Sequence, residues 1–378
     1  MGSWKTCTIS DLGTVVGGAT PSTKNTENYD GGTIPWITPK DLASFSDRFI
    51  SHGERNITES GLNSCSAQLM PAHTILFSSR APIGYIAIAE RELCTNQGFK
   101  SVIPNKNTDY MFLYYLLKYN RAKIENLGSG TTFKEVSGST MRGIEVSVPE
   151  SIDEQRRIAH VLSALDDKIE INNQINGNLL QQASSIYQAW FEDFVLPDGS
   201  YPSDWKQGTL SDIADIMSGK RPPVKSAEKT DTAVIPLVGA ASVMGYTTEA
   251  NHTDKILVIG RVGTHGVVQR FNSPCWTSDN TLVITSDLYE YTFQILQRID
   301  YRAMNRGSTQ PLITQGDMNK VSVLIPDKET LSSFEALVGQ LMEQYEANLL
   351  ENVKFAELRD TLLPKLMSGE LDVSDIEL

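Results

Sequence analysis

Two pairs of polar segments carry side chains that are able to make paired hydrogen bonds. In the first half of the chain, Arg80 follows one apolar run, and Asn96 and Gln97 follow another. In the second half, Arg261 and Asn280 follow similar apolar runs. Guanidinium and amide groups present two hydrogen-bonding atoms at a fixed separation, which suits them to the edges of nucleobases when a loop holds them outward. These residues therefore favour recognition chemistry over bond cleavage.

The candidates for base contact share a loop position and a suitable side chain, but they also have a structural interpretation. Arg80 and Arg261 could brace their loops, and Asn96 and Asn280 could cap turns, because recurrence in both halves is also typical of a shared scaffold. The full set of candidates is Arg80, Asn96, Gln97, Lys134, Arg261, His265, Asn280 and Gln310.

Other loop residues fit contact with phosphate. Lys220, Arg221 and Lys225 form the clearest local basic cluster, although a solvated loop would have the same composition. Small hydroxyl residues in two polar turns are expected either to touch phosphate or to close the turn. They are Thr131, Thr132, Ser308 and Thr309.

Residues that commonly carry catalysis or bind metals are scattered. Gly219 and Lys220 do not form a phosphate-binding P-loop, because Arg221 stands where Ser or Thr would bind magnesium. We find no dinucleotide loop, no adenine-methylation motif, no Walker motif and no HExxH helix. We therefore expect no catalytic residue, no metal site and no cofactor of its own. The scattered residues are His52, His73, His160 (expected on a helix surface), His252, His265, Cys7, Cys65, Cys94 and Cys275.

Length and charge limit the possible classes of protein. A chain of 378 residues predicts two or three domains, and the net charge of −13 argues against indiscriminate binding to phosphate backbones. Much of the acid falls in segments that are predicted to be helices or tail, which leaves room for local basic surfaces. No apolar run reaches membrane-spanning length and the N-terminus lacks a signal-peptide core, so a cytoplasmic location is expected.

A long helix is predicted from Ser151 to about Phe194. This stretch contains no proline and a single glycine, Gly177, and its apolar residues recur at intervals of three and four. Such a helix would be roughly 60 Å long, so it needs a partner helix to cover its apolar face.

The C-terminal segment repeats this helix at a constant offset, since Ile158 and Phe334 are 176 residues apart and so are Asn172 and Asn348. The heptad spacing predicts an antiparallel coiled coil in which Asn172 faces Asn348 and fixes the register. Two unrelated amphipathic helices are the alternative. The matched positions are Ile158, Val161, Leu165, Asn172, Asn176, Leu179, Ile186 and Trp190, with Phe334, Leu337, Leu341, Asn348, Asn352, Phe355, Leu362 and Leu366.

The duplication extends into the segments that precede the helices. Trp4 returns as Trp205, and Ile34 returns as Ile235. Each half predicts strands (74–77, 85–89 and 101–103; 256–259, 267–270 and 281–284), an aromatic-rich helix (109–126; 288–304) and a last strand into proline (141–149; 318–326). The offset between matching segments is 201 for Trp4 and Ile34 but falls to 181 in the strands that follow, so the first half carries about 20 more residues, between 38 and 74.

The predicted fold is α+β, with two pseudo-symmetric α/β domains separated by two long antiparallel helices that form a coiled coil. The domains span 1–150 and 196–326, the helices 151–195 and 327–368, and an acidic tail 369–378. Two similar globules on a rigid rod would suit a target that repeats, such as the major grooves of duplex DNA, roughly 34 Å apart on one face.

The whole chain resembles the specificity (S) subunit of type I restriction-modification systems. The motifs that carry this resemblance are IPWITPKDL at 34–42, LFSSRAPIG at 76–84, TNQGF at 95–99, VPESIDEQRRIAHVLSALDDKIE at 148–170, QAWFEDF at 188–194 and LLPKLMSGEL at 362–371.

The resemblance implies two target recognition domains that bind a bipartite double-stranded DNA site, and helices that dock two methyltransferase (M) subunits. Restriction (R) subunits would join through them. S-adenosylmethionine, ATP and Mg would belong to these partner subunits and not to this chain. The sequence leaves two alternatives: a non-catalytic coiled-coil adaptor that binds only proteins, which the acidic charge favours slightly, and an enzyme with an unrecognised active site.

Overall fold

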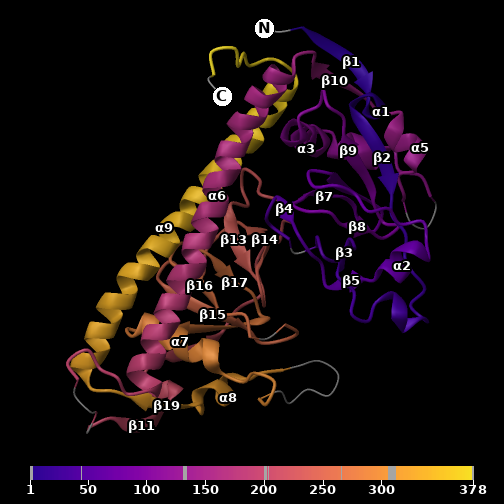
Figure 1. The fold of residues 1–378 in the computed structure, drawn as a ribbon. Helices are drawn as coiled ribbons and strands as arrows, with labels where there is room; N and C mark the ends of the chain where they lie inside the picture. The colour runs from indigo at the N-terminus through magenta and orange to yellow at the C-terminus, as the bar shows by residue number, and fades with distance from the viewer. Residues whose placement is uncertain are drawn as a thin grey trace. The chain divides into compact units, whose positions relative to one another are not determined.

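The computed structural model describes residues 3–43, 45–130, 134–199, 202, 204–264, 266–304 and 312–376. The chain forms two compact units, Met1–Asn173 with Leu349–Leu378, and Gln174–Asn348. Each unit holds one β-rich globule and part of each of two long helices, α6 (Ile152–Tyr187) and α9 (Lys328–Met367) (Figure 1). We call Trp4–Pro149 the first globule and Lys206–Ile325 the second globule.

In the first globule the last strand returns to the first, because β1 (Trp4–Thr8) pairs antiparallel with β10 (Glu145–Pro149). A five-stranded sheet has the order β2-β9-β6-β7-β4, and a three-stranded sheet has the order β5-β3-β8. The remaining elements are α1 (Ile9–Leu12), β2 (Gly13–Gly17), η1 (Thr26–Asn28), β3 (Ile34–Ile37), β4 (Phe49–Ile50), β5 (Arg55–Ile57), α2 (Glu59–Asn63), β6 (Ile75–Ser79), β7 (Ile83–Ala89), β8 (Cys94–Thr95), β9 (Lys100–Pro104), α3 (Tyr110–Tyr119), α4 (Arg121–Asn126) and α5 (Gly138–Arg142).

The second globule repeats this topology. Strand β11 (Lys206–Thr209) pairs antiparallel with β19 (Ser322–Ile325), a four-stranded sheet has the order β12-β18-β15-β16, and a three-stranded sheet has the order β14-β13-β17. The remaining elements are η3 (Leu210–Asp212), β12 (Asp215–Ser218), β13 (Ile235–Val238), β14 (Val243–Thr247), β15 (Ile256–Gly260), β16 (Gln269–Phe271), β17 (Trp276–Thr277), β18 (Thr281–Thr285), α7 (Tyr289–Arg298) and α8 (Gln315–Asn319).

The extra residues of the first globule form elements of their own. Strand β4 pairs in parallel with β7 at the edge of the five-stranded sheet, and helix α2 follows β5. Among the described residues, neither has a counterpart in the second globule. Strand β6, like its counterpart β15, is buried at every residue, so the central strands of both sheets lie in apolar cores.

Two predicted strands begin later than expected. The segments 141–149 and 318–326 each start inside a short helix, α5 or α8, before β10 and β19 begin at Glu145 and Ser322. Side-chain caps explain these helices: Ser137 Oγ accepts a hydrogen bond from Thr140 N (3.0 Å), and Thr314 Oγ1 accepts one from Asp317 N (3.2 Å). The predicted helix 109–126 is likewise divided, into α3 and α4, at Asn120.

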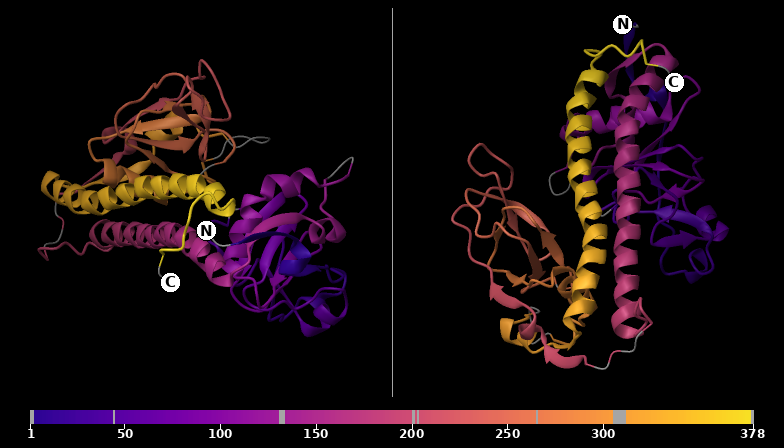
Figure 2. Two further views of the ribbon diagram at one scale, coloured as in Figure 1. Left: turned by 90° about the horizontal axis from the view of Figure 1, so that it is seen from above. Right: turned by 90° about the vertical axis from the view of Figure 1, so that its left-hand side faces the viewer.

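Helices α6 and α9 pack together, as predicted, and run antiparallel (Figure 2). In the first unit, Ile158 and Leu162, early in α6, share a core with Leu366, late in α9. In the second unit, Tyr187, late in α6, contacts Phe334, early in α9. In the described ranges no helix is both long and apolar enough to cross a membrane.

The expected pairing of Asn172 with Asn348 is wrong by one helical turn. In the first unit, Asn172 Nδ2 donates to Oδ1 of Asn352 (2.9 Å) and to Oε2 of Glu351 (2.8 Å). In the second unit, Asn348 Nδ2 donates to Oδ1 of Asn176 (2.9 Å). The observed register pairs four asparagines instead of two, which is favourable because a buried amide without a partner is costly.

The end of α6 also differs from the prediction of one regular helix to Phe194. The α-helix ends at Tyr187 and continues as a π-helical turn over Gln188–Glu192. This turn places Trp190 and Phe191 in the core of the second globule, where both rings pack on Phe334 at centroid distances of 5.8 and 5.0 Å.

Candidate nucleic-acid interface

Most of the predicted contact residues lie in four loops that occur once in each globule. Loop A (18–22; 219–223) follows β2 or β12, and loop B (79–82; 261–268) begins at the last residue of β6 or directly after β15. Loop C (95–99; 277–280) begins at the last residue of β8 or β17, and loop D (127–137; 299–314) precedes α5 or α8. Backbone hydrogen bonds join these loops in the same way in both globules.

Loop A lies against the start of loop C. In the first globule, Ala19 N donates to the Thr95 carbonyl oxygen (3.0 Å). In the second, Lys220 N donates to the Thr277 carbonyl oxygen (2.9 Å). These equivalent bonds make Ala19 and Lys220 structural counterparts.

Loop C also lies against loop B. In the first globule, Ser79 N donates to the Gly98 carbonyl oxygen (2.7 Å). In the second, Arg261 N donates to the Asn280 carbonyl oxygen (2.8 Å). Ser79 is therefore the counterpart of Arg261, and Gly98 that of Asn280.

Loop D completes the set through the same two residues of loop B. Val136 N donates to the Ser79 carbonyl oxygen (3.0 Å), and Ile313 N donates to the Arg261 carbonyl oxygen (3.0 Å). Each globule thus brings four loops from distant parts of the chain to one place, on a scaffold that satisfies their backbone groups.

These bonds correct the similarity that the sequence indicated. Arg80 and Arg261 do not occupy equivalent positions, because Arg261 matches Ser79. Asn96 and Asn280 do not match either, because Asn280 stands where the first globule has Gly98. These arginines and asparagines therefore do not recur at equivalent positions of the shared scaffold. The two loop sets present different side chains at matched positions.

In each globule a tryptophan side chain donates a hydrogen bond to loop A. The two tryptophans lie on strands that are not equivalent, because β3 corresponds to β13 and β17 corresponds to β8. Trp36 on β3 donates its Nε1 hydrogen to the Ala19 carbonyl oxygen (3.0 Å). Trp276 on β17 donates its own to the Lys220 carbonyl oxygen (2.8 Å). The two carbonyls are equivalent, yet the tryptophans are not. Alignment of the halves could not have indicated this shared role.

The first globule favours the structural interpretation for two candidates. Arg80 forms an ion pair with Glu135 (3.6 Å), which Lys100 also contacts (3.3 Å). Asn96 Oδ1 accepts from Gly98 N (2.8 Å), which caps the turn of loop C. These two side chains already have partners inside the protein.

The two other candidates of the first globule that the structure describes, Gln97 and Lys134, are exposed. Gln97 Oε1 accepts a hydrogen bond from Thr20 Oγ1 of loop A. Lys134 lies in loop D. Both side chains are therefore accessible to a ligand.

In the second globule the exposed side chains of loops A and C are more basic. Lys220, Arg221 and Asn280 are all exposed, and so is Lys225 just beyond loop A. Burial, together with the charge of Lys220, lowers the pKa of His252, so this imidazole adds no positive charge near neutral pH. The positive charge of this surface comes from its lysines and arginine.

Several predicted contact residues lie outside the described residues: Thr131, Thr132, His265, Ser308, Thr309 and Gln310. His160 is exposed on α6, as expected. Within the described ranges, no three histidine, cysteine or acidic side chains lie close enough to hold a metal ion, and all four cysteines are free thiols.

Comparison with known proteins identifies the family. The profile described as "Type I restriction modification DNA specificity domain" matches residues 1–181 and 202–357. The chain belongs to the specificity subunits of type I restriction-modification systems. It is therefore a DNA specificity subunit and itself non-catalytic, which favours the predicted function over an adaptor that binds only proteins.

Two curated relatives and one solved structure illustrate the similarity of this specificity subunit to others. It is 36% identical to the type I restriction enzyme MjaIX specificity subunit of Methanocaldococcus jannaschii, over 99% of this chain and 94% of that one. It is 23% identical to the HindI specificity subunit of Haemophilus influenzae, over 72% and 80% of the chains. The crystal structure of the S subunit from M. genitalium shares the fold, with a TM-score of 0.59, 20% identity and coverage of 97% and 96%.

Proposed function

We propose that this specificity subunit binds a bipartite, asymmetric DNA site in which each globule contacts one half. The observation that carries the proposal is the repeated set of four loops with different side chains at matched positions. Ala19 in the first globule is replaced by Lys220 in the second, and Gly98 by Asn280. An equivalent scaffold with unlike side chains predicts an equivalent approach to DNA and unlike half-sites.

The basic surface of the second globule supports a role for its loop A in phosphate contact. Lys220 and Arg221 are exposed beside loop C, whose Asn280 is exposed too. Lysine and arginine supply affinity through phosphates, and asparagine can pair with adenine. The net charge of −13 does not oppose this role, because the acidic side chains that contribute to it include many on α6 and α9.

The long helices would determine how many base pairs between the half-sites are left uncontacted. Each helix runs from one unit into the other as a single α-helix between its bounds, with one proline, Pro364, in the last turn and a half of α9. A helix is stiff over such lengths, so its residue count would set a fixed separation between the two loop sets.

Two methyltransferase (M) subunits are the proposed protein partners, with restriction (R) subunits joining through them. In the first unit the paired helices expose large apolar side chains that soluble surfaces rarely group together: Ile171 (48%), Leu350 (63%) and Val353 (56%). S-adenosylmethionine, ATP and Mg would be held by these partners. The assembly would act in the cytoplasm, where its DNA substrate lies.

Methylome sequencing of cells that carry this chain with its M subunit tests the proposal. We expect one methylated motif composed of two unlike half-sites around a fixed gap. In vitro, selection from random duplexes by the purified complex should enrich the same motif. A complex that methylates a continuous motif, or that enriches no sequence, would contradict the proposal.

A further inference from the structure

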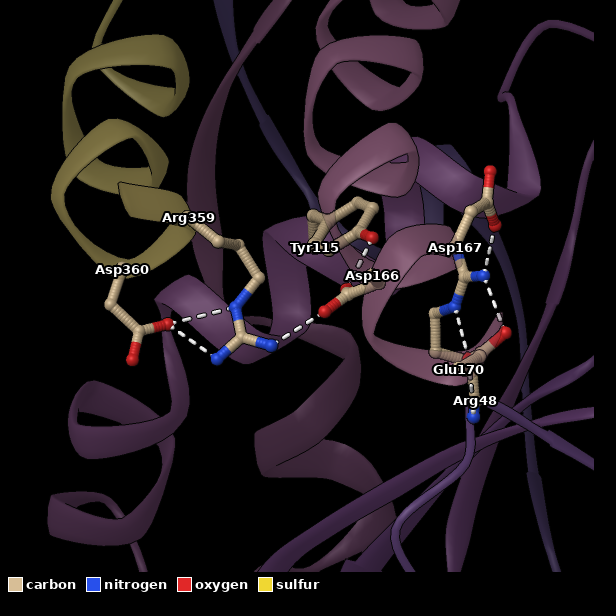
Figure 3. Close-up of polar contacts among 7 residues, drawn as sticks. All are labelled: Arg48, Tyr115, Asp166, Asp167, Glu170, Arg359 and Asp360. Atoms are coloured by element: carbon tan, nitrogen blue, oxygen red, sulfur yellow. Dashed lines mark hydrogen bonds and ion pairs between the residues drawn. The ribbon is translucent and has the colours of Figure 1, made fainter. Parts of the chain in front are cut away.

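Each globule inserts one buried arginine between itself and the paired helices. In the first unit, Arg48 is 5% exposed and contacts α6 (Figure 3). Its Nε donates to Glu170 Oε1 (2.7 Å) and its Nη2 to Glu170 Oε2 (2.8 Å), while Nη2 also pairs with Asp167. The two-point contact with Glu170 fixes both the position and the angle of the guanidinium plane.

The second unit contains a similar contact with α9. Arg270 forms its two-point contact with Glu290 of α7, from Nη1 (2.5 Å) and Nη2 (2.8 Å), and Nη2 also donates to Glu346 Oε1 of α9 (3.0 Å). Asn272 Nδ2 donates to the other oxygen of Glu346 (2.5 Å). The guanidinium also lies over the rings of Tyr289 (4.8 Å) and Phe293 (4.7 Å). Its side chain is 7% exposed, so the contact is shielded from water.

The carboxylates are counterparts, whereas the arginines are not. Glu170 and Glu346 are 176 residues apart, the offset that relates the two helices. Arg270 lies within β16, opposite Leu257, whereas Arg48 lies just before the additional strand β4. The two globules therefore reach the same helix position from different strands.

Buried charges of this kind are an expensive means of attachment. Burial disfavours the Arg48 cation, but its bonds to Glu170 and Asp167 outweigh that cost and keep its pKa above the ordinary value. Apolar side chains of similar volume often stabilise such an interface at least as well. What a planar, two-point ion pair adds is a defined orientation.

The first unit has a second polar link between its helices and its globule, also drawn in Figure 3. Asp166 of α6 is 5% exposed; it accepts a hydrogen bond from Tyr115 of α3 (2.6 Å) and pairs with Arg359 of α9 (2.5 Å). At the matching helix positions the second unit has Ala183 and Met342 in its apolar core. The Arg48 and Arg270 contacts are thus the polar attachment that both units share.

We propose that Arg48 and Arg270 are positioning residues, which fix the angle of each globule on the paired helices and thereby restrict the gap length that the complex accepts. The inference rests on the proposed bipartite function. One added base pair moves a half-site by about 3.4 Å and turns it by about a tenth of a helical turn. Only a complex whose globules are held at fixed angles would bind a duplex with one added base pair less tightly.

The test measures binding of the holocomplex with its M subunit to duplexes that carry the natural gap, one base pair fewer or one base pair more. For the unmodified complex we expect at least about tenfold tighter binding at the natural gap. The Arg48→Lys and Arg270→Lys variants retain the charge and lose the planar fork. Their preference for the natural gap should fall to about threefold or less, with both half-sites unchanged.

Two further variants separate positioning from general stability. Arg156→Lys alters an exposed ion pair with Asp153 on α6 and should leave the gap preference unchanged. Glu170→Gln leaves Arg48 itself unchanged but removes the carboxylate that holds its guanidinium at two points. It should reproduce the loss seen with Arg48→Lys, and it supplies the measurement if the lysine variant melts at the assay temperature.

The possible failures are distinct. If the unmodified complex enriches no gapped motif, the proposed function itself is wrong. If it prefers one gap and the folded Arg48→Lys, Glu170→Gln and Arg270→Lys variants keep that preference at least tenfold, the positioning role is overturned.

Discussion

Asn172 of α6 donates a hydrogen bond of 2.9 Å to the side chain of Asn352 of α9, and Glu351 shares the same amide group. The bond belongs to a polar cluster between the helices, in which Asn352 Nδ2 also donates to Asn173 Oδ1 (2.9 Å), and it defines their register in the first unit. Replacing only Asn172 by leucine should destabilise the protein by about 1–3 kcal/mol, because Oδ1 of Asn352 and the Glu351 carboxylate would both lose this donor.

Urea unfolding measures this effect, with Asn178→Leu on the exposed face of α6 as the matched control. The double variant Asn172→Leu, Asn352→Leu should recover part of the loss, since both amides are removed together. Additive losses in the double variant would show that the pair does not couple the helices.

The length of the paired helices should determine the gap. Inserting four residues after Gly177 in α6 and four after Ala347 in α9 adds about 6 Å to both helices, which equals about two base pairs of duplex. Gly177 has no neighbouring atom that a side chain would meet. Methylome sequencing should then find both half-sites intact around a gap about two base pairs longer. An altered half-site would contradict this role of the helices.

The basic residues of loop A should supply affinity without sequence preference. Replacing Lys220 and Arg221 by alanine should weaken binding to all duplexes alike and reduce the slope of log affinity against log salt by about 2. Salt titrations of specific and random duplexes measure both effects. Lys354→Ala, an exposed lysine of α9, is the control. A change confined to one base position would instead assign direct base contact to the cluster.

The two tryptophans should act on separate half-sites. Trp36→Phe and Trp276→Phe each keep a ring but remove the hydrogen bond that holds loop A. We expect each to lower affinity by roughly five- to tenfold, equivalent to about 1 kcal/mol, and only for duplexes that retain the matching half-site. Competition against duplexes with one half-site scrambled measures this. Trp4→Phe, in β1, should affect neither half-site.

The exposed apolar side chains of the first unit should be needed for the methyltransferase partner. Leu350→Asp with Val353→Asp places two charges on a surface that is 63% and 56% exposed at these residues, so the fold should survive. Co-purification with the M subunit should fall at least about tenfold. Leu69→Asp, exposed in the first globule, is the control, and undiminished assembly of the double variant would exclude this surface.

Several structural features followed from the sequence. The spacing of apolar residues and the constant offset between Ile158 and Phe334 predicted the duplicated helices, because a helix must bury one face along its whole length. Alternating and buried apolar runs likewise predicted the strands β6 and β15, since their periodicity is local. The family resemblance followed from short motifs around these same elements.

The tertiary structure decided which residues meet. The register of the asparagines, the match of Arg261 with Ser79, and the use of Trp36 and Trp276 for one role all depend on contacts between segments far apart in the chain. A periodic pattern fixes which face of an element is buried, but a shift of one turn along a helix or an exchange between neighbouring strands preserves that pattern. Only the packing of complete side chains and the pairing of buried polar groups distinguish such arrangements.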